Sequence, residues 1–216
     1  MVKIINVKGR QVFDSRGNPT VEAEVFLDNG ISATSISPSG ASTGAYEAYE
    51  LRDQDKKSFL GKSVLKAVEN INKKIALILK GLDPINQSKI DKILLDLDGS
   101  ENKKNLGANA TLAVSLANSK SAALSIKKPL YKHLGSSYSL PNPLMNIING
   151  GAHADNDLNI QEFMIRPDSA INFMDAIEKC FLVIQNLKSL LKSKKMLTNV
   201  GDEGGFAPSI NTNEEA

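Results

Sequence analysis

The hydrophobic positions near the N-terminus follow the period of a β-strand. From residue 21 to residue 27 apolar and polar side chains alternate, with Phe26 as the one exception, and this pattern is typical of a strand with one buried face. Asp28-Asn29-Gly30 then supplies a hairpin turn, and residues 31–36 supply a return strand. The first 36 residues are therefore predicted to be extended.

From residue 62 the apolar positions follow the period of a helix. The segment ends at Gly81 and Pro84, and its expected buried stripe consists of Val64, Val68, Ile71, Ile75 and Ile78. Residues 90–97 repeat the pattern up to Gly99. Residues 108–126 form a third helix, whose many alanines and serines suit close packing. Strands followed by helices predict an α+β domain over residues 1–135.

The second part of the chain has a different pattern. Glycine, serine and proline are frequent over residues 135–143 and mark a domain boundary. Short apolar runs at 144–148, 160–165 and 197–200 predict strands, residues 170–191 predict an amphipathic helix, and polar loops follow the strands. Functional groups at strand ends are typical of β/α barrels. Residues 140–216 are therefore predicted to be the first, incomplete part of a TIM-like barrel.

Composition and charge exclude several classes of protein. The chain has 26 basic and 24 acidic side chains, and no run of basic residues exceeds two, which argues against a nucleic-acid surface. No signal peptide is evident, and no apolar run approaches the roughly 18 residues that span a membrane. Cys180 is the single cysteine, which indicates a reducing compartment. Its position in an apolar helical series favours a buried thiol over a nucleophile.

The best candidate for chemistry is a glycine-rich bend near the end of the chain. Asp202 and Glu203 are adjacent and lie among Gly201, Gly204 and Gly205. Carboxylates this close repel each other, which raises the pKa of at least one of them. A carboxyl group that keeps its proton near neutral pH can act as a general acid.

A loop of small residues over positions 37–48 offers a second candidate. It lacks the Gly-Lys-Ser/Thr ending of a P-loop, which excludes nucleoside-triphosphate binding of that type. Two interpretations stay open. Either Ser42 supplies an oxygen ligand to a hard cation or a phosphate on a mobile lid, or the segment is a solvated connector with a helix cap.

Two further candidates lie between these two segments. His153 follows a glycine hinge, where it either acts on an anionic substrate or carries a proton, or is a loop histidine without a role; His133 is interpreted as structural. Gln161 and Glu162 fall inside an apolar strand pattern. A buried carboxylate costs several kcal/mol unless it is paired, so these two residues favour a cavity with a charged occupant.

Taken together and in order, the motifs of this chain resemble those of the enolase family. The resemblance runs from about residue 4 to residue 208. It is carried by DSRGNPTVE at 14–22, PSGASTG at 38–44, ELRD at 50–53, DLDGSENK at 96–103, LGANA at 106–110, MNIINGG at 145–151, QEF at 161–163 and VGDEGG at 200–205.

The resemblance implies a reaction and a role for each candidate residue. Enolases interconvert 2-phosphoglycerate and phosphoenolpyruvate with Mg²⁺ as cofactor, and the superfamily pairs a Lys or His base with one or two Mg²⁺ ions. By position in the motifs, Glu203 resembles the general acid at the leaving hydroxyl, and Glu162 resembles the carboxylate beside it. Gln161 lies in the same substrate-binding strand, His153 resembles the histidine near the substrate phosphate, and Ser42 resembles a ligand of the second Mg²⁺. Ala152 departs from the family, in which many members have a polar or acidic residue before the histidine.

The resemblance also implies that much of the enzyme lies outside this chain. Family members continue for about as many residues again, and that part holds three Mg²⁺ carboxylates, the lysine base and a phosphate-binding Arg-Ser pair. We therefore expect the chain to be the N-terminal half of a cytoplasmic, homodimeric enolase and to be inactive alone. Cell-surface display is a further property of the family. The alternatives are a non-catalytic binding module and one half of a split enzyme.

Overall fold

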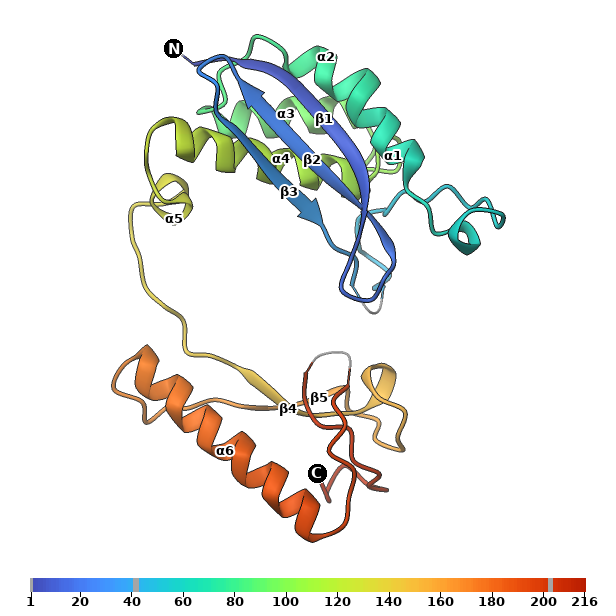
Figure 1. Ribbon diagram of the computed structural model, residues 1–216, viewed down its shortest axis with the longest axis vertical. Coiled ribbons are helices and arrows are strands. Elements are labelled where there is room, and N and C mark those ends of the chain that lie inside the picture. Colours follow the sequence, from blue (N-terminus) through green and yellow to red (C-terminus); the bar gives the residue numbers. More distant parts are fainter. Residues whose placement is uncertain (1, 41–42, 202–203) are drawn as a thin grey trace. The chain divides into compact units, whose positions relative to one another are not determined.

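The computed structural model describes residues 2–40, 43–201 and 204–216. The chain divides into two compact units, which are Met1–Tyr138 and Ser139–Ala216. Each unit has its own sheet and its own helices (Figure 1). The two units are described separately below.

Unit 1 begins with an antiparallel sheet. Its strands are β1 (Ile4–Phe13), β2 (Pro19–Leu27) and β3 (Ser32–Ser37), in the order β1-β2-β3. The alternating residues of β2 are buried as the pattern predicts, and Gly30 adopts the positive φ of 81° that the turn before β3 requires. The predicted hairpin is therefore confirmed.

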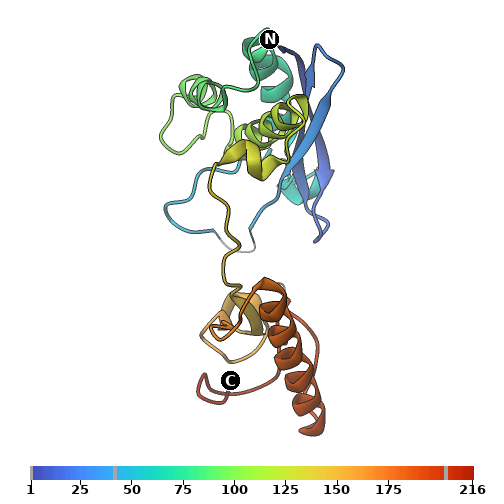
Figure 2. The ribbon, with the colours of Figure 1, turned by 90° about the vertical axis from the view of Figure 1, so that its left-hand side faces the viewer.

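Helices cover one face of this sheet, as Figure 2 shows. They are α1 (Leu65–Asn70), α2 (Ala76–Leu79), α3 (Gln87–Asp98), α4 (Ala108–Ser125) and α5 (Leu130–Leu134), and a 3-10 turn precedes them at Phe59–Gly61. α4 buries Ala110, Ala113 and Ala117 completely in the core that it shares with β2. Small side chains let the helix approach the strands closely, so the predicted close packing is confirmed, and the order of strands then helices confirms the α+β class.

The first helical segment differs from its predicted stripe. A π-helical turn, Ile71–Ile75, joins α1 to α2, and the segment buries Val64, Ala67, Ile71, Ile75 and Leu79. A π turn closes i→i+5 hydrogen bonds and holds more residues than an α turn. Successive buried residues of this segment are therefore four positions apart, at Ile71, Ile75 and Leu79. The prediction that Ile78 is buried was wrong, because it assumed 3.6 residues per turn throughout; Ile78 is 44% exposed.

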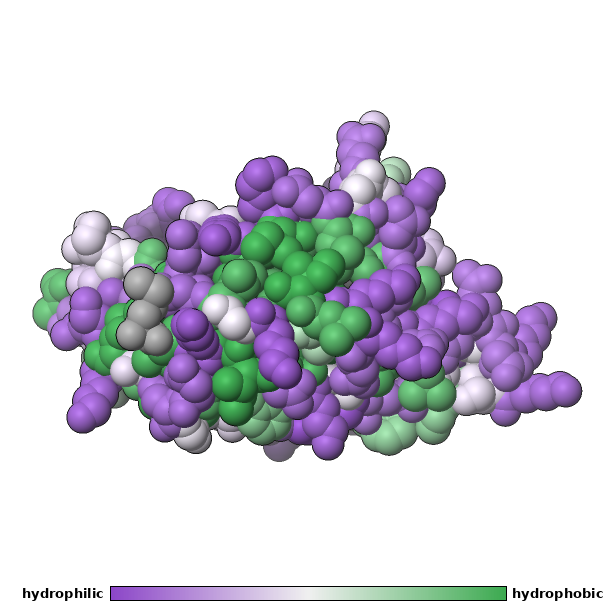
Figure 3. Space-filling model, turned by 90° about the horizontal axis from the view of Figure 1, so that it is seen from above, coloured by the Kyte–Doolittle hydropathy of each residue, from purple (hydrophilic) through white to green (hydrophobic). Residues whose placement is uncertain are grey.

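The same shift leaves apolar side chains on the outside of α2. Leu77 is 73% exposed. Figure 3 shows hydrophobic residues gathered on this face of unit 1, over the region of α2, with hydrophilic residues around them. None of the helices in the described part of the chain is long and apolar enough to cross a membrane.

Unit 2 starts with a hairpin. β4 (Met145–Asn149) pairs with β5 (Glu162–Ile165) in antiparallel orientation, and α6 (Phe173–Ser193) follows, which confirms the helix predicted over residues 170–191. A strand was also predicted at 197–200. Val200 instead makes a single antiparallel bridge to Phe206, because the chain folds back across the glycine-rich bend, and Phe206 forms a parallel bridge to Ile148 of β4.

Little of unit 2 is buried. Its core cluster consists of Ile148, Leu158 and Ile210, with Phe163 and Leu187 partly buried against it. Along α6, Cys180 is buried, which confirms the predicted buried thiol. However, Phe181 and Leu182 are 56% and 50% exposed. Apolar surface on α6 therefore has no cover within the unit.

Candidate functional site

Two glycines at the end of β4 allow the chain to turn sharply into the candidate site. A Cβ atom at Gly150 would lie 2.5 Å from the backbone oxygen of Ile160 and 2.5 Å from Cβ of Leu158. The backbone N–H of Gly150 donates to the oxygen of Gln161 at 2.9 Å, and that of Gly151 donates to the oxygen of Leu158 at 2.7 Å. Only residues without side chains fit this close approach. The turn leads directly into a 3-10 turn, Gly151–His153.

His153 and Glu162 meet at the end of the hairpin. The imidazole Nδ1 lies 3.5 Å from Oε1 of Glu162. His153 is only 8% exposed, and its Nδ1 has no hydrogen-bond partner among the described residues. Glu162 is the first residue of β5 and pairs in register with Asn149. A buried imidazole beside a carboxylate can hold a proton or face an anion, depending on its protonation state.

Asn149 connects this pair to the glycine-rich bend. Its side chain is fully buried, and its Nδ2 donates to the oxygen of Gly205 at 3.2 Å. Gly201 lies so close that a Cβ there would meet Asn149 Nδ2 at 2.2 Å and the backbone oxygen of His153 at 2.7 Å. The bend itself is closed by the N–H of Gly201, which donates to the oxygen of Gly205 at 2.8 Å. Gly201 therefore lies beside Asn149 and the backbone of His153, and Gly205 lies beside Asn149.

The structure thus brings some of the predicted residues together. His153 and Glu162 are neighbours. Glu203 lies outside the described residues; of the glycines near it in sequence, Gly201 lies next to Asn149 and the backbone oxygen of His153, and Gly205 lies next to Asn149. Ser42 also lies outside the described residues, and its segment belongs to unit 1.

Gln161 requires a correction. The sequence placed it inside a buried strand, but it lies one residue before β5 and its side chain is exposed. Its backbone oxygen accepts a hydrogen bond from the N–H of Gly150 at 2.9 Å, at the point where β4 has ended and the chain turns. Glu162 is half-buried, so the cost of its burial is smaller than a fully buried strand position would impose.

The described residues do not form a metal centre by themselves. No three His, Cys, Asp or Glu side chains among residues 2–40, 43–201 and 204–216 lie close enough together to hold a metal ion. Within the described part of the chain, Glu162 and His153 are a pair without a third partner of this kind. A metal site in this protein would need ligands from outside this set.

Sequence reasoning missed the role of Asn149. The residue ends an apolar run and precedes two glycines, a pattern that by itself indicates only a turn. Its amide also accepts a hydrogen bond from Asn146 Nδ2 at Oδ1, and its backbone oxygen accepts one from Asn156 Nδ2 at 2.9 Å. The dense run of asparagines over residues 142–159 was the available signal, because buried amides need such partners.

Comparison with known proteins matches the whole described chain to one family. The family model of the enolase N-terminal domain matches residues 4–134, and the model of the enolase C-terminal TIM barrel domain matches residues 137–216. The enolase of Pelagibacter ubique (strain HTCC1062) is 58% identical over 218 residues, which cover 100% of this chain and 52% of that protein. The chain therefore spans about half the length of this curated relative.

Proposed function

Since the chain belongs to the enolase family, we propose that it forms the N-terminal half of an enolase, a lyase that reversibly dehydrates 2-phosphoglycerate to phosphoenolpyruvate. The observation that supports this proposal is the contact of His153 with Glu162 at the end of β4 and β5. Gly201, the residue before Asp202 and Glu203 in sequence, also lies beside the backbone oxygen of His153.

The proposed roles follow from the chemistry of the leaving group. Hydroxide leaves poorly, so a carboxyl group that protonates it accelerates the reaction by roughly 10²–10⁴-fold. Glu203 is the proposed general acid. Glu162 is the carboxylate beside it, and its negative charge favours the protonated form of its neighbour. His153 faces the anionic phosphate of the substrate, and Gln161 contributes to the same substrate-binding segment.

The proposed cofactor is Mg²⁺. Because the described residues hold no cluster of metal-binding side chains, the metal would depend on Ser42 and on ligands from the part of the enzyme that this chain does not cover. The proposed assembly is a cytoplasmic homodimer of the complete protein. The 216-residue chain is proposed to be inactive alone, because the base and most metal ligands of the family lie in the other half.

A chimera tests the proposal directly. This chain would be fused to the residues of the Pelagibacter ubique enolase that follow the matched region, and conversion of 2-phosphoglycerate would be followed by the ultraviolet absorbance of phosphoenolpyruvate. We expect Mg²⁺-dependent turnover in the chimera and none in the 216-residue chain. Glu203→Gln should abolish turnover, and Glu69→Gln, at an exposed position of α1, should leave it unchanged.

Three results would contradict the proposal. A folded chimera without activity would mean that this chain does not form half of an active enolase. If Glu203→Gln left the turnover of the chimera unchanged, Glu203 would not be the general acid. Mg²⁺-dependent dehydration by the purified 216-residue chain would show that it does not need a second half.

A further inference from the structure

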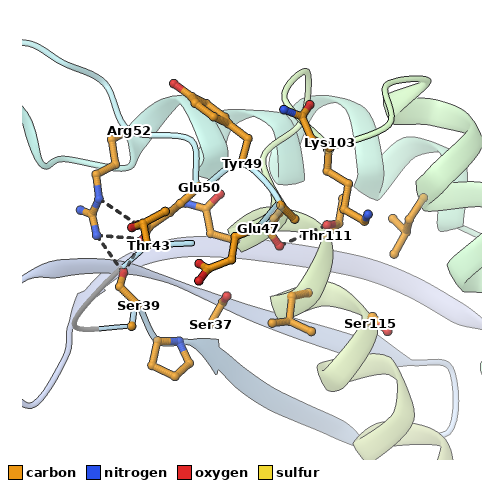
Figure 4. Close-up of a pocket in the computed structure, with 18 of the residues that line it drawn as sticks. Ser37, Ser39, Thr43, Glu47, Tyr49, Glu50, Arg52, Lys103, Thr111 and Ser115 are labelled. Carbon is orange, nitrogen blue, oxygen red and sulfur yellow. Dashed lines mark hydrogen bonds and ion pairs between the residues drawn. The ribbon is translucent and has the colours of Figure 1, made fainter. Parts of the chain in front are cut away.

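The largest hollow in unit 1 is lined by polar side chains that already have partners. It measures about 950 Å³, and its lining comes from the chain after β3 and from α3 and α4. Figure 4 shows Arg52 directed at both Glu50 and Ser39. Among the described residues that line it, no buried polar side-chain atom lacks a hydrogen-bond partner. The hollow therefore offers no unpaired buried group to a ligand, and the most reactive feature of unit 1 lies in the turn at the other end of β3.

The dipeptide Asn-Gly occurs twice in this chain, as Asn29-Gly30 and as Asn149-Gly150. An asparagine side chain holds its amide carbon, Cγ, within reach of the backbone nitrogen of the next residue, and attack there closes a five-membered ring. Glycine leaves this approach open because it has no Cβ. The two sites therefore share the same local chemistry, and a difference between them must come from the fold.

The fold leaves Asn29-Gly30 open to water. Asp28, Asn29 and Gly30 form the exposed turn between β2 and β3. A Cβ atom at Gly30 would meet nothing within 4 Å, so the surroundings of the attacking nitrogen leave room for a ring. The N–H of Gly30 donates to the oxygen of Leu27 at 3.1 Å. This hydrogen bond at a solvent-exposed turn has to open before the nitrogen can attack.

The turn also supplies a donor to the oxygen on which charge develops. The N–H of Ile31 donates to Oδ1 of Asn29 at 3.2 Å. Attack on Cγ places negative charge on this oxygen, and a donor already aimed at it stabilises that charge. Ile31 is itself held in the hairpin, because its oxygen accepts from the N–H of Leu27 at 2.8 Å.

The fold closes the second site. Asn149 is 0% exposed, its Nδ2 donates to the oxygen of Gly205 at 3.2 Å, and the N–H of Gly150 donates to the oxygen of Gln161 at 2.9 Å. Its Oδ1 accepts from Asn146 Nδ2, so a donor at this oxygen is common to both sites. What differs is that the departing amide, the attacking nitrogen and the access of water are all restrained at Asn149.

We propose that Asn29 is a site of spontaneous deamidation and that the fold protects Asn149 from the same reaction. The nitrogen of Gly30 bonds to Cγ of Asn29 as the Cγ–Nδ2 bond breaks. The departing amide takes the proton of the Gly30 N–H and leaves as ammonia. Water is the only co-reactant: its hydroxyl bonds to either carbonyl carbon of the ring, and its proton returns to the nitrogen. The proposal does not depend on the proposed function.

The two ways of opening the ring have different consequences for the hairpin. Both place a new carboxylate beside Asp28. One product is ordinary aspartate, which keeps the length of the turn. The other leads the main chain through the side-chain carbons of residue 29 and adds one methylene to the turn. Because turn length sets the register of a hairpin, this second product should disturb the pairing of β2 with β3.

Peptide mass spectrometry of the 216-residue chain tests the proposal. The folded chain is incubated in neutral buffer and digested at intervals, and the fraction of each asparagine converted to the acid is measured. We expect Asn29 to react roughly tenfold faster than Asn149 or more, because Asn149 must first break its hydrogen bonds and this raises the barrier. In denaturant at the same pH the two sites should react at similar rates, since the fold no longer distinguishes them.

Two comparisons separate this site from exposure alone. Asn211 is exposed but precedes Thr212, whose Cβ hinders the attack, so Asn211 should react much more slowly than Asn29. Asn29→Gln would require a six-membered ring and should suppress the acidic species that ion exchange separates from the fresh chain.

Four results would overturn the proposal. The first is an equal rate at Asn29 and Asn149 in the folded chain. The second is an Asn29 that stays intact in the folded chain and reacts only in denaturant. The third is a difference between the two sites that persists in denaturant, since the fold would then not be its cause. The fourth is a rate at Asn211 that matches that of Asn29, or an acidic species that forms unchanged in Asn29→Gln.

Discussion

At the scale of single residues, the buried carboxylate of Asp98 organises the turn after α3. Oδ1 accepts hydrogen bonds from the N–H of Ser100 at 3.0 Å and from its hydroxyl, and Oδ2 accepts from the N–H of Leu106 at 2.6 Å. Burial by itself would raise the pKa of Asp98, but the hydrogen bonds from Ser100 and Leu106 outweigh it and hold the pKa below the ordinary 3.8. The ionised form is therefore the one that stabilises the fold.

Asp98→Asn is expected to lower the free energy of unfolding by about 1–3 kcal/mol at neutral pH, because an amide sets a donor against one of the N–H groups. A carboxyl with a depressed pKa stabilises fully above its unfolded value, and this contribution disappears as the pH falls through the folded value. The difference between wild type and variant should therefore shrink below pH 3.8. Asp96→Asn, at an exposed position of the same helix, is the control. The free energy of unfolding would be measured by denaturant titration. Equal losses in Asp98→Asn and Asp96→Asn would mean that the hydrogen bonds of the Asp98 carboxylate do not stabilise the fold.

Gly150 is a second single residue on which local structure depends. Its φ of −148° is open to any residue, so the need for glycine is one of space and not of backbone strain. Gly150→Ala would push Cβ into the backbone of Ile160 and should destabilise unit 2 by about 1–3 kcal/mol. Gly135→Ala places its Cβ 4.0 Å from the nearest atom and should be nearly neutral. Thermal unfolding followed by circular dichroism compares the two, and a neutral Gly150→Ala would show that the turn can open.

At the scale of elements, the π-helical turn protects the free edge of β1. Asn72 lies in this turn and its side chain accepts from the N–H of Gly9 at 2.8 Å and donates to the oxygen of Gly9 at 3.1 Å. The chain after α2 pairs with Ile4 in a similar way, through Gly81 and Leu82. Unpaired strand edges invite association with other chains. The π turn therefore places an amide where a further strand would otherwise pair.

Asn72→Ala should leave both backbone groups of Gly9 without their side-chain partner. We expect a loss of about 1–2 kcal/mol in the free energy of unfolding. Lys74→Ala changes an exposed residue of the same turn and should stay within about 0.5 kcal/mol. Denaturant unfolding of the two variants decides the matter. If both lose the same amount, the turn matters for its helical structure alone and not for the edge of β1.

The elements also show which features the sequence can predict. The alternation over residues 21–27 and the stripe that ends at Gly99 depend on local period, so β2 and α3 were predicted correctly. The π turn was not, because the contact that Asn72 of this turn makes is with Gly9 of β1, which is distant in sequence. The contact of His153 with Glu162 was not predicted, since it forms only when β5 pairs with β4.

At the scale of the whole molecule, the two units differ greatly in how much apolar surface they bury. Unit 1 has a continuous core from its sheet through α4. The cluster in unit 2 is small, and α6 leaves Phe181 and Leu190 about half exposed. Stability rises with the apolar area removed from water, so unit 2 should unfold under milder conditions than unit 1. A regular barrel takes about 250 residues to close its core, and unit 2 has the start of one.

The distribution of tyrosines allows this difference to be measured without labels. All four tyrosines, Tyr46, Tyr49, Tyr131 and Tyr138, belong to unit 1, and the chain has no tryptophan. Tyrosine fluorescence therefore reports unit 1 alone, whereas circular dichroism at the helix band also reports α6. In a denaturant titration we expect an early circular-dichroism transition with no change in fluorescence, followed by a transition that both signals share. The polypeptide of residues 1–138 should show only the later transition, at the same midpoint. Coincident transitions in the full chain would mean that unit 2 gains its stability from unit 1, and the two units would then unfold as one.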